Sequence, residues 1–134
     1  MEQVEVKSLA TKVGRIGFGC DPLGEYGWGA LDRSAMAAAI HVALDSGIDL
    51  FDISDAYGLG RAELTLGEAL VGKRSRAVIV SKFGVRMEDG RGTFYDNSVA
   101  CACQRLGKAP DRVGCTSFAS ITLPGGRTST PSFR

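Results

Sequence analysis

Three polar side chains follow apolar stretches that are typical of buried strands. Asp52 directly follows Leu50 and Phe51, Tyr57 comes five residues later, and Lys82 follows the stretch AVIVS. A free phenol titrates near pH ~10 and is a poor acid at neutrality, but a nearby ammonium stabilises the phenolate and lowers the pKa. A carboxylate can hold that ammonium charged and oriented. These residue types predict a tyrosine that donates a proton to a developing alkoxide, or removes one in the reverse direction.

The natural partner of this proton transfer is delivery of a hydride to a carbonyl carbon, because the proton then completes an alcohol. The hydride has to come from a bound cofactor, since cofactors carry redox chemistry of this kind. Taken singly, Asp52 reads as a helix cap or turn residue, Tyr57 as a half-buried aromatic residue and Lys82 as a solvated strand end. The prediction therefore depends on the three residues together.

Strands and helices are predicted to alternate over most of the chain. Strands are expected at residues 15–19, 48–54 and 77–81, and a helix is expected after each strand, the third at 98–106. Asp32 or Ser34 can cap the first helix, and Gly47 suits the left-handed conformation just past its end. Apolar residues at helical spacing mark the first two helices: Met36, Ile40, Ala43, Leu44, Ala62, Leu66, Ala69 and Leu70. The alternation predicts an α/β fold with a parallel sheet, either a doubly wound sheet or a (β/α)8 barrel.

The connecting segments help to separate these two architectures. In a doubly wound dinucleotide domain, a glycine fingerprint follows the first strand and opens a helix at once. Here Gly17 and Gly19 lead instead into a long loop, CDPLGEYGWGALD, so we discount that fold. An eight-stranded barrel needs about 250 residues, and this chain has 134. The first arm of a hairpin is expected at VEVKSLA, and a polar glycine-rich loop is expected from Gly84 to Gly92.

Composition and charge exclude several classes of protein. Hydrophobic residues make up 44% of the chain and charged residues 23%, which is typical of a globular domain. The formal net charge is +1 without a block of like charge, so nothing indicates binding to nucleic acid or to an anionic membrane. No apolar run is long enough to span a bilayer, and the N-terminal residues lack the apolar centre of a signal peptide. We therefore expect a cytoplasmic protein.

The cysteines and the single histidine predict structural roles. Four cysteines in a cytosolic chain of this size do not indicate a disulfide framework, and we interpret them as small buried residues. A zinc site would show a second close pair of Cys or His ligands, so no metal site is expected. His41 follows Ile40 in the first helix and is predicted to lie at the surface. Asp55 is predicted to be a solvated loop residue.

Three stretches of the sequence together resemble the aldo-keto reductase family. They are RIGFGC, AALDSGIDLFDISDAYGLGRAELTLGEAL and VIVSKFG, and the resemblance runs from about Val13 to Gly107. This family is a (β/α)8 barrel that uses NADPH or NADH to reduce aldehydes and ketones to alcohols. The resemblance implies the N-terminal part of such a barrel, with NADPH as cofactor and NADH as the alternative. A small carbonyl or alcohol is the implied substrate.

The resemblance also implies catalytic roles for individual residues. The catalytic tetrad of the family is Asp, Tyr, Lys and His. By motif, Asp52 matches the aspartate, Tyr57 the proton donor and Lys82 the lysine. His41 does not match the tetrad histidine, which belongs at the end of the fourth strand.

Binding roles are implied for the loops that follow the first two strands. Gly19 and Cys20 match a loop that lies beside the nicotinamide in relatives, and Asp52 is placed with them as a cofactor contact. Tyr26 and Trp28 lie in a loop that often borders the substrate pocket.

The resemblance stops near Val113. The family expects a short apolar strand ending in histidine, whereas this sequence reads GCTSFASITLPGG. We expect a partial barrel of about three βα units over residues 1–112 and a disordered, non-family tail over residues 113–134. A shifted reading frame would explain the change if one inserted or deleted base in the gene restores the family pattern, and truncation or fusion are the alternatives.

Two expectations about activity follow from this divergence. The tetrad histidine and the later loops that grip most of the cofactor in relatives have no match, so we expect these 134 residues to be inactive or weakly active. The alternative is a non-catalytic barrel piece that associates with a complementary chain, because a partial barrel has open sheet edges. The same edges predict low stability of the chain by itself, and the oligomeric state is left open.

Overall fold

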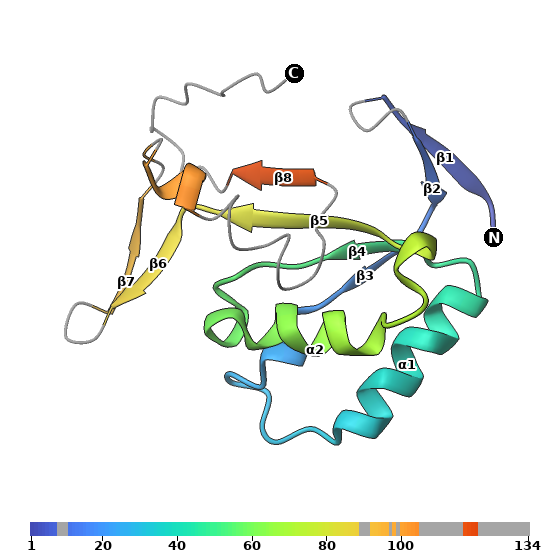
Figure 1. Cartoon of the computed structure of the whole chain (residues 1–134), viewed down its shortest axis with the longest axis horizontal. Helices are drawn as coiled ribbons and strands as arrows, with labels where there is room; N and C mark the ends of the chain where they lie inside the picture. The colour runs from blue at the N-terminus through green and yellow to red at the C-terminus, as the bar shows by residue number, and fades with distance from the viewer. Residues whose placement is uncertain (8–10, 89–91, 97, 99, 105–116, 121–134) are drawn as a thin grey trace.

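A parallel sheet forms the centre of the molecule (Figure 1). The computed structural model describes residues 1–7, 11–88, 92–96, 98, 100–104 and 117–120. The sheet contains four strands in the order β3 (Gly17–Gly19), β4 (Leu50–Asp52), β5 (Val78–Phe83) and β8 (Ser117–Ser120), and each neighbouring pair is parallel. The α/β organisation with a parallel sheet is therefore as predicted.

Two helices cover one face of this sheet, as Figure 1 shows. They are α1 (Arg33–Asp45) and α2 (Arg61–Ala69). The side chain of Asp32 caps α1 by accepting hydrogen bonds from the backbone N–H groups of Ser34 and Ala35. Gly47 adopts a left-handed conformation just beyond the helix, with φ of +83°. The predicted cap, helix end and apolar stripes are all present.

A hydrophobic core fills the space between the sheet and these helices. Successive strand residues point to opposite faces, and Phe51 and Ile79 are the fully buried hydrophobic residues of β4 and β5. They belong to one cluster with Ile40 from α1 and Leu66 from α2, which are also fully buried. Each side chain of this kind contributes roughly 1.5–3 kcal/mol when it leaves water. The core thus fixes the strands whose ends carry the polar residues.

The other face of the sheet is more open. The alternate residues of the three strands β3, β4 and β5 lie on it and are half-buried or exposed: Gly17, Gly19, Leu50, Asp52, Val78, Val80 and Lys82. The sheet therefore has an apolar helix-covered face and a mixed, partly solvated face.

Two antiparallel hairpins flank the sheet. The first joins β1 (Gln3–Val6) to β2 (Thr11–Gly14), which confirms the hairpin expected at the N-terminus. The second joins β6 (Val85–Glu88) to β7 (Gly92–Tyr95), where the sequence had predicted a polar glycine-rich loop from Gly84 to Gly92. That prediction was wrong because the polar composition of this stretch gives no signal of the antiparallel pairing between its strands. Gly84, with φ of +105°, turns the chain out of β5 into this hairpin.

Short 3-10 turns lie in several of the described connections. They are η2 (Asp21–Gly24), η3 (Tyr57–Gly60) and η4 (Arg74–Arg76). Of the third predicted helix, residues 100–104 are helical, and its remaining positions lie partly outside the described residues. Of the predicted tail, residues 117–120 form β8 and the rest lies outside the described residues, so its disorder stays a prediction.

Two predictions about polar residues were wrong. His41 is half-buried, and its Nε2 atom lies 2.7 Å from the backbone carbonyl oxygen of Ala69, so it links α1 to the end of α2. Asp55 is 5% exposed and lies in the interior. Both errors have the same cause, since only the packing of neighbouring segments decides whether a polar side chain in a short pattern is covered.

Two further features concern membranes and metals. Within the described ranges, no helix combines the length and the apolar character needed to cross a membrane. In the same part of the chain, no group of three or more His, Cys, Asp or Glu side chains is arranged to hold a metal ion.

Candidate active site

Strand register brings the predicted catalytic residues to one edge of the sheet. Asp52 ends β4 and pairs with Val80 of β5, so Lys82 lies two residues further along β5 on the same face. Tyr57 begins η3, which directly follows β4. In barrel enzymes, active sites assemble at the carboxyl ends of the parallel strands.

The ammonium of Lys82 connects the other two residues. Its Nζ atom donates to both carboxylate oxygens of Asp52, each at 2.6 Å, and to the hydroxyl oxygen of Tyr57 at 3.2 Å. A longer contact of 3.3 Å reaches the backbone carbonyl oxygen of Ile53. Nζ also lies 5.1 Å from the centre of the Tyr57 ring. The structure thus brings the three predicted catalytic residues together, with Lys82 in contact with both Asp52 and Tyr57.

These contacts set the charge of the lysine. Partial burial acts to lower the pKa of Lys82, but hydrogen bonds and charge interactions with Asp52 and Tyr57 outweigh it, so the pKa is raised from its ordinary value. Lys82 therefore stays an ammonium at neutral pH. An ammonium can only donate hydrogen bonds, so the oxygen of Tyr57 acts as acceptor toward Lys82. The phenol hydrogen remains available for another acceptor.

A compact turn holds the backbone of Tyr57. Its N–H donates to the carbonyl oxygen of Ser54 at 3.1 Å, and the Ser54 hydroxyl accepts from the N–H of Ala56, also at 3.1 Å. Ser54 is 1% exposed, so both bonds are shielded from water. The ring of Tyr57 is half-buried and packs against the hydrophobic core. Contacts of its backbone and of its ring therefore both hold Tyr57 in place.

Gly19 and Cys20, the predicted cofactor contacts, differ in what they present. A Cβ atom built on Gly19 would meet nothing within 4 Å, so the end of β3 is open on the face that carries Asp52. Cys20 is fully buried, with Sγ 3.7 Å from the carbonyl oxygen of Phe18. Burial, followed by the negative charge of Asp52, raises the pKa of the Cys20 thiol to about 12. Its side chain belongs to the core, and only its backbone lies at this edge.

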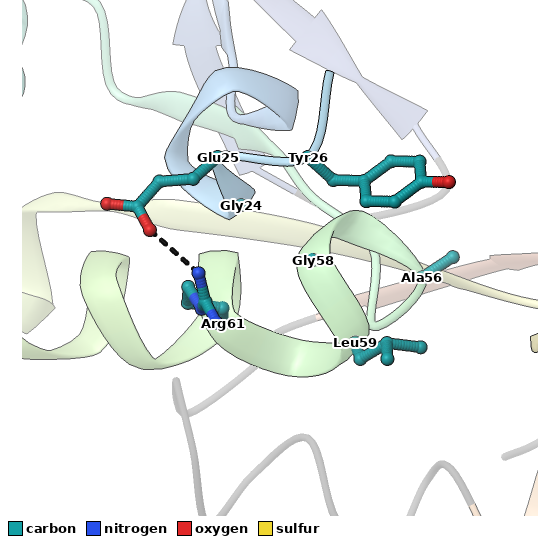
Figure 2. Close-up of a pocket in the computed structure, with 7 residues that line it drawn as sticks. All are labelled: Gly24, Glu25, Tyr26, Ala56, Gly58, Leu59 and Arg61. Carbon is teal, nitrogen blue, oxygen red and sulfur yellow. Dashed lines mark hydrogen bonds and ion pairs between the residues drawn. The ribbon is translucent and has the colours of Figure 1, made fainter. Parts of the chain in front are cut away.

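The predicted substrate residues lie on the loop after β3. Tyr26 is 73% exposed and borders a hollow of about 230 Å³, shown in Figure 2. The hollow is lined by Gly24, Glu25, Tyr26, Ala56, Gly58, Leu59 and Arg61. Trp28 does not line it: its indole N–H donates to Asp21 at 3.2 Å. The structure therefore places Tyr26, but not Trp28, at a hollow next to Tyr57.

A buried polar pair behind the site was missed in the sequence. Glu63 is fully buried, and its Oε1 atom accepts a hydrogen bond of 3.1 Å from the hydroxyl of Ser81. Ser81 directly precedes Lys82, so the pair ties α2 to the end of β5. The sequence did contain a signal that Glu63 is buried. It lies three residues before Leu66 and seven before Leu70, on the apolar face of the helix.

Comparisons with known proteins agree on one family. The sequence model of the Aldo/keto reductase family matches residues 15–121. Aldo-keto reductase YhdN of Bacillus subtilis is 34% identical over 84 residues, which is 61% of this chain and 25% of that protein. The chain therefore spans about a quarter of the length of this curated relative.

Solved structures show the same likeness. A putative aldo-keto reductase from Pseudomonas aeruginosa superposes with a TM-score of 0.73 at 30% identity, covering 84% of this chain and 42% of that chain. An aldo/keto reductase from Klebsiella pneumoniae, in complex with NADP and acetate, superposes with a TM-score of 0.59 at 25% identity, covering 79% of this chain and 33% of that chain.

Fold, site and comparisons now define the class of protein. The parallel sheet with its helices on one face is the N-terminal part of a (β/α)8 barrel, which confirms the predicted fold class. The chain belongs to the aldo/keto reductase family, whose named relatives are oxidoreductases.

Proposed function

We propose that this chain carries the proton-transfer machinery of an NAD(P)H-dependent oxidoreductase that reduces aldehydes and ketones to alcohols. The observation that supports this most directly is the Lys82 ammonium, which contacts Asp52 at 2.6 Å and Tyr57 at 3.2 Å. A fixed cation next to a phenol oxygen stabilises the negative charge that appears there when the proton leaves. The substrates are small carbonyl compounds in one direction and alcohols in the other.

Each residue has a separate role in this proposal. Tyr57 donates its phenol proton to the oxygen of the carbonyl substrate. Lys82 stabilises the phenolate left behind, since its positive charge lies 3.2 Å from that oxygen. Asp52 orients the ammonium through two short hydrogen bonds and keeps it charged. Asp52 and Lys82 thus act on Tyr57, and Tyr57 acts on the substrate.

A nicotinamide cofactor fits the open end of β3. When bound, this group supplies the hydride that reduces the carbonyl carbon. The backbone of Gly19 borders free space in which a Cβ atom would meet nothing within 4 Å, and the carboxylate of Asp52 is half-exposed on the same face. We propose that Gly19, Asp52 and the backbone of Cys20 contact the nicotinamide. NADPH is the proposed cofactor, with NADH as the alternative, and the Klebsiella relative was solved with NADP.

Turnover by these 134 residues is expected to be low. The fourth strand, β8, has the sequence SFAS and contributes no histidine, and the single histidine, His41, is bonded to Ala69 in the helical layer. Tyr57 would therefore act without the histidine that completes the catalytic tetrad of the family. We also propose that the protein is cytoplasmic, and that the partial barrel ends at residue 112 and the non-family tail begins at residue 113.

Cofactor binding and proton donation can be tested separately. Titration of the chain with NADPH is followed by quenching of Trp28, the single tryptophan, and saturable quenching at micromolar cofactor would support the proposed cofactor site. Reduction of small aldehydes is then compared between wild type, Tyr57→Phe and Tyr95→Phe. Tyr57→Phe removes only the hydroxyl and should abolish reduction without loss of quenching. Tyr95 is an exposed residue of β7 and serves as the matched control.

A non-catalytic association role is the second candidate. The observation that favours it is the open sheet, in which β3 and β8 are edge strands of the described part of the chain. Unpaired edges and a half-buried sheet face can pair with another chain that completes a barrel. Light scattering after size exclusion, and co-purification of a second barrel-like chain, test this role. A chain that binds NADPH as a compact monomer would contradict it.

A further inference from the structure

Two glycines from different turns meet directly beside Tyr57. A Cβ atom on Gly24 of η2 would lie 2.6 Å from the backbone carbonyl carbon of Tyr57 and 2.9 Å from its carbonyl oxygen. A Cβ atom on Gly58 of η3 would also collide with the backbone of Gly24. Real Cβ atoms do not approach backbone atoms this closely. The two turns can therefore cross here only because neither glycine has a side chain.

Strained backbone surrounds the same crossing. Among the described residues, only Glu25 and Leu59 are non-glycine residues with positive φ, at +62° and +58°. Each directly follows one of the two crossing glycines. Left-handed conformations are unfavourable for residues with a Cβ atom and persist only where the surrounding structure imposes them. In the described part of the chain, both strained residues therefore lie at the point where η2 and η3 touch.

The crossing is held in place from both sides. On the solvent side, Arg61 of α2 donates to Glu25 at 2.7 Å, which Figure 2 shows as the contact bridging the two segments. On the core side, Leu23 of η2 is 4% exposed and packs in the hydrophobic cluster. Gly24 lies between these two anchors and is itself buried. The backbone of Tyr57 therefore rests against a fixed surface.

We propose that Gly24 is a positioning residue for Tyr57, and that the Gly24–Gly58 crossing sets where the phenol oxygen lies relative to Lys82. The inference rests on the proposed role of Tyr57 as proton donor. The ring extends from a backbone that the crossing fixes, and its hydroxyl ends 3.2 Å from the Lys82 ammonium. A shift of a few tenths of an ångström away from Lys82 brings the hydroxyl to the limit of hydrogen-bond range, which lies at about 3.5 Å.

Gly24→Ala tests this inference with a single added methyl group. Gly24 has no positive φ, so alanine strains nothing at the residue itself and acts only through the contact with Tyr57. Gly17→Ala is the matched control, because its Cβ would lie 3.4 Å or more from Leu50, in ordinary van der Waals contact. Circular dichroism establishes that each variant is folded. The readouts are the NMR signals of the Tyr57 ring carbon Cζ and of the Lys82 ammonium.

Gly24→Ala is expected to shift both signals and to leave the Tyr95 ring signal in place, while Gly17→Ala changes none of them. If the chain is active, kcat in Gly24→Ala should fall tenfold or more, with the Kd for NADPH changed less than about twofold. Unchanged Tyr57 and Lys82 signals in folded Gly24→Ala would overturn the inference. Because the signals are read without substrate or cofactor, failure of the proposed function, seen as no NADPH binding and no aldehyde reduction, would leave this test intact.

Arg61→Ala covers the case in which Gly24→Ala does not fold. This change adds no atom at the crossing and removes the contact with Glu25 that holds η2 from the solvent side. It is expected to loosen the crossing and to shift or broaden the Tyr57 signal. A sharp Tyr57 signal at its wild-type position in Arg61→Ala would then overturn the inference.

Discussion

The ammonium of Lys82 lies 2.6 Å from both carboxylate oxygens of Asp52, although 30 residues separate them in the sequence. Partial burial acts against the lysine charge, and the contacts with Asp52 and Tyr57 restore it, so the pKa of Lys82 is raised. Asp52→Asn removes the main stabilising charge, and the pKa of Lys82 should then fall. NMR titration of the Lys82 Nζ signal measures this. Asp45→Asn is the control, since Asp45 binds Arg76 on the surface.

The same shift predicts how stability depends on pH. The folded pKa of Lys82 is higher than its ordinary value of 10.5, so the stabilisation from its contacts is complete below pH 10.5 and is lost as pH rises through the folded pKa. The difference in unfolding free energy between wild type and Lys82→Met should therefore be constant from pH 7 to 9 and shrink above about pH 10.5. Urea unfolding at several pH values measures it. A difference that stays constant into strong alkali would contradict the raised pKa.

Cys20 is expected to be unreactive although it lies next to the site. Burial, and to a lesser degree the charge of Asp52, raise the pKa of its thiol to about 12, so almost no thiolate forms at pH 8. Cys103 is exposed, so the prediction of buried cysteines was wrong for this residue. Iodoacetamide should alkylate Cys103 at least about tenfold faster than Cys20. Peptide mapping by mass spectrometry gives both rates. In denaturant the two rates should converge, and equal rates in the native chain would show that Cys20 is accessible.

Two substitutions on α1 should separate core packing from helix propensity. Ile40 is fully buried, and Ile40→Val removes one methylene group from the core, at an expected cost of about 1 kcal/mol. Val42 is 65% exposed, so Val42→Ala removes more atoms but should change stability by less than about 0.5 kcal/mol. Urea midpoints compare the two variants. The opposite ranking would mean that the cluster between α1 and the sheet is not the core of the folded chain.

The buried bond between Ser81 and Glu63 should contribute measurably to stability. Ser81→Ala leaves the buried Glu63 carboxylate with one donor fewer, which is expected to cost about 1–3 kcal/mol. Ser75→Ala, at an exposed position of η4, is the control and should be close to neutral. A double-mutant cycle with Glu63→Gln isolates the pair, and additive effects of the two changes would exclude a direct interaction.

Much of the fold and the central site could be predicted from sequence because both rest on local patterns. The apolar stripe of α1, its Asp32 cap and the left-handed Gly47 depend only on near neighbours in the chain. Alternation of strands and helices then requires a parallel sheet whose strand ends share one edge. That rule was enough to bring Asp52 and Lys82 together in the prediction before any distance was known.

Other features depend on contacts between segments far apart in the chain, and a one-dimensional pattern does not contain them. Spacing could not show that the Cys20 thiol turns into the core, or that Asp55 is covered. The meeting of Gly24 with Gly58 is decided by how η2 packs on η3. The sequence by itself therefore determined which residues could carry the chemistry. Only the tertiary structure decided which neighbours hold them in place, because burial and close approach belong to pairs of segments.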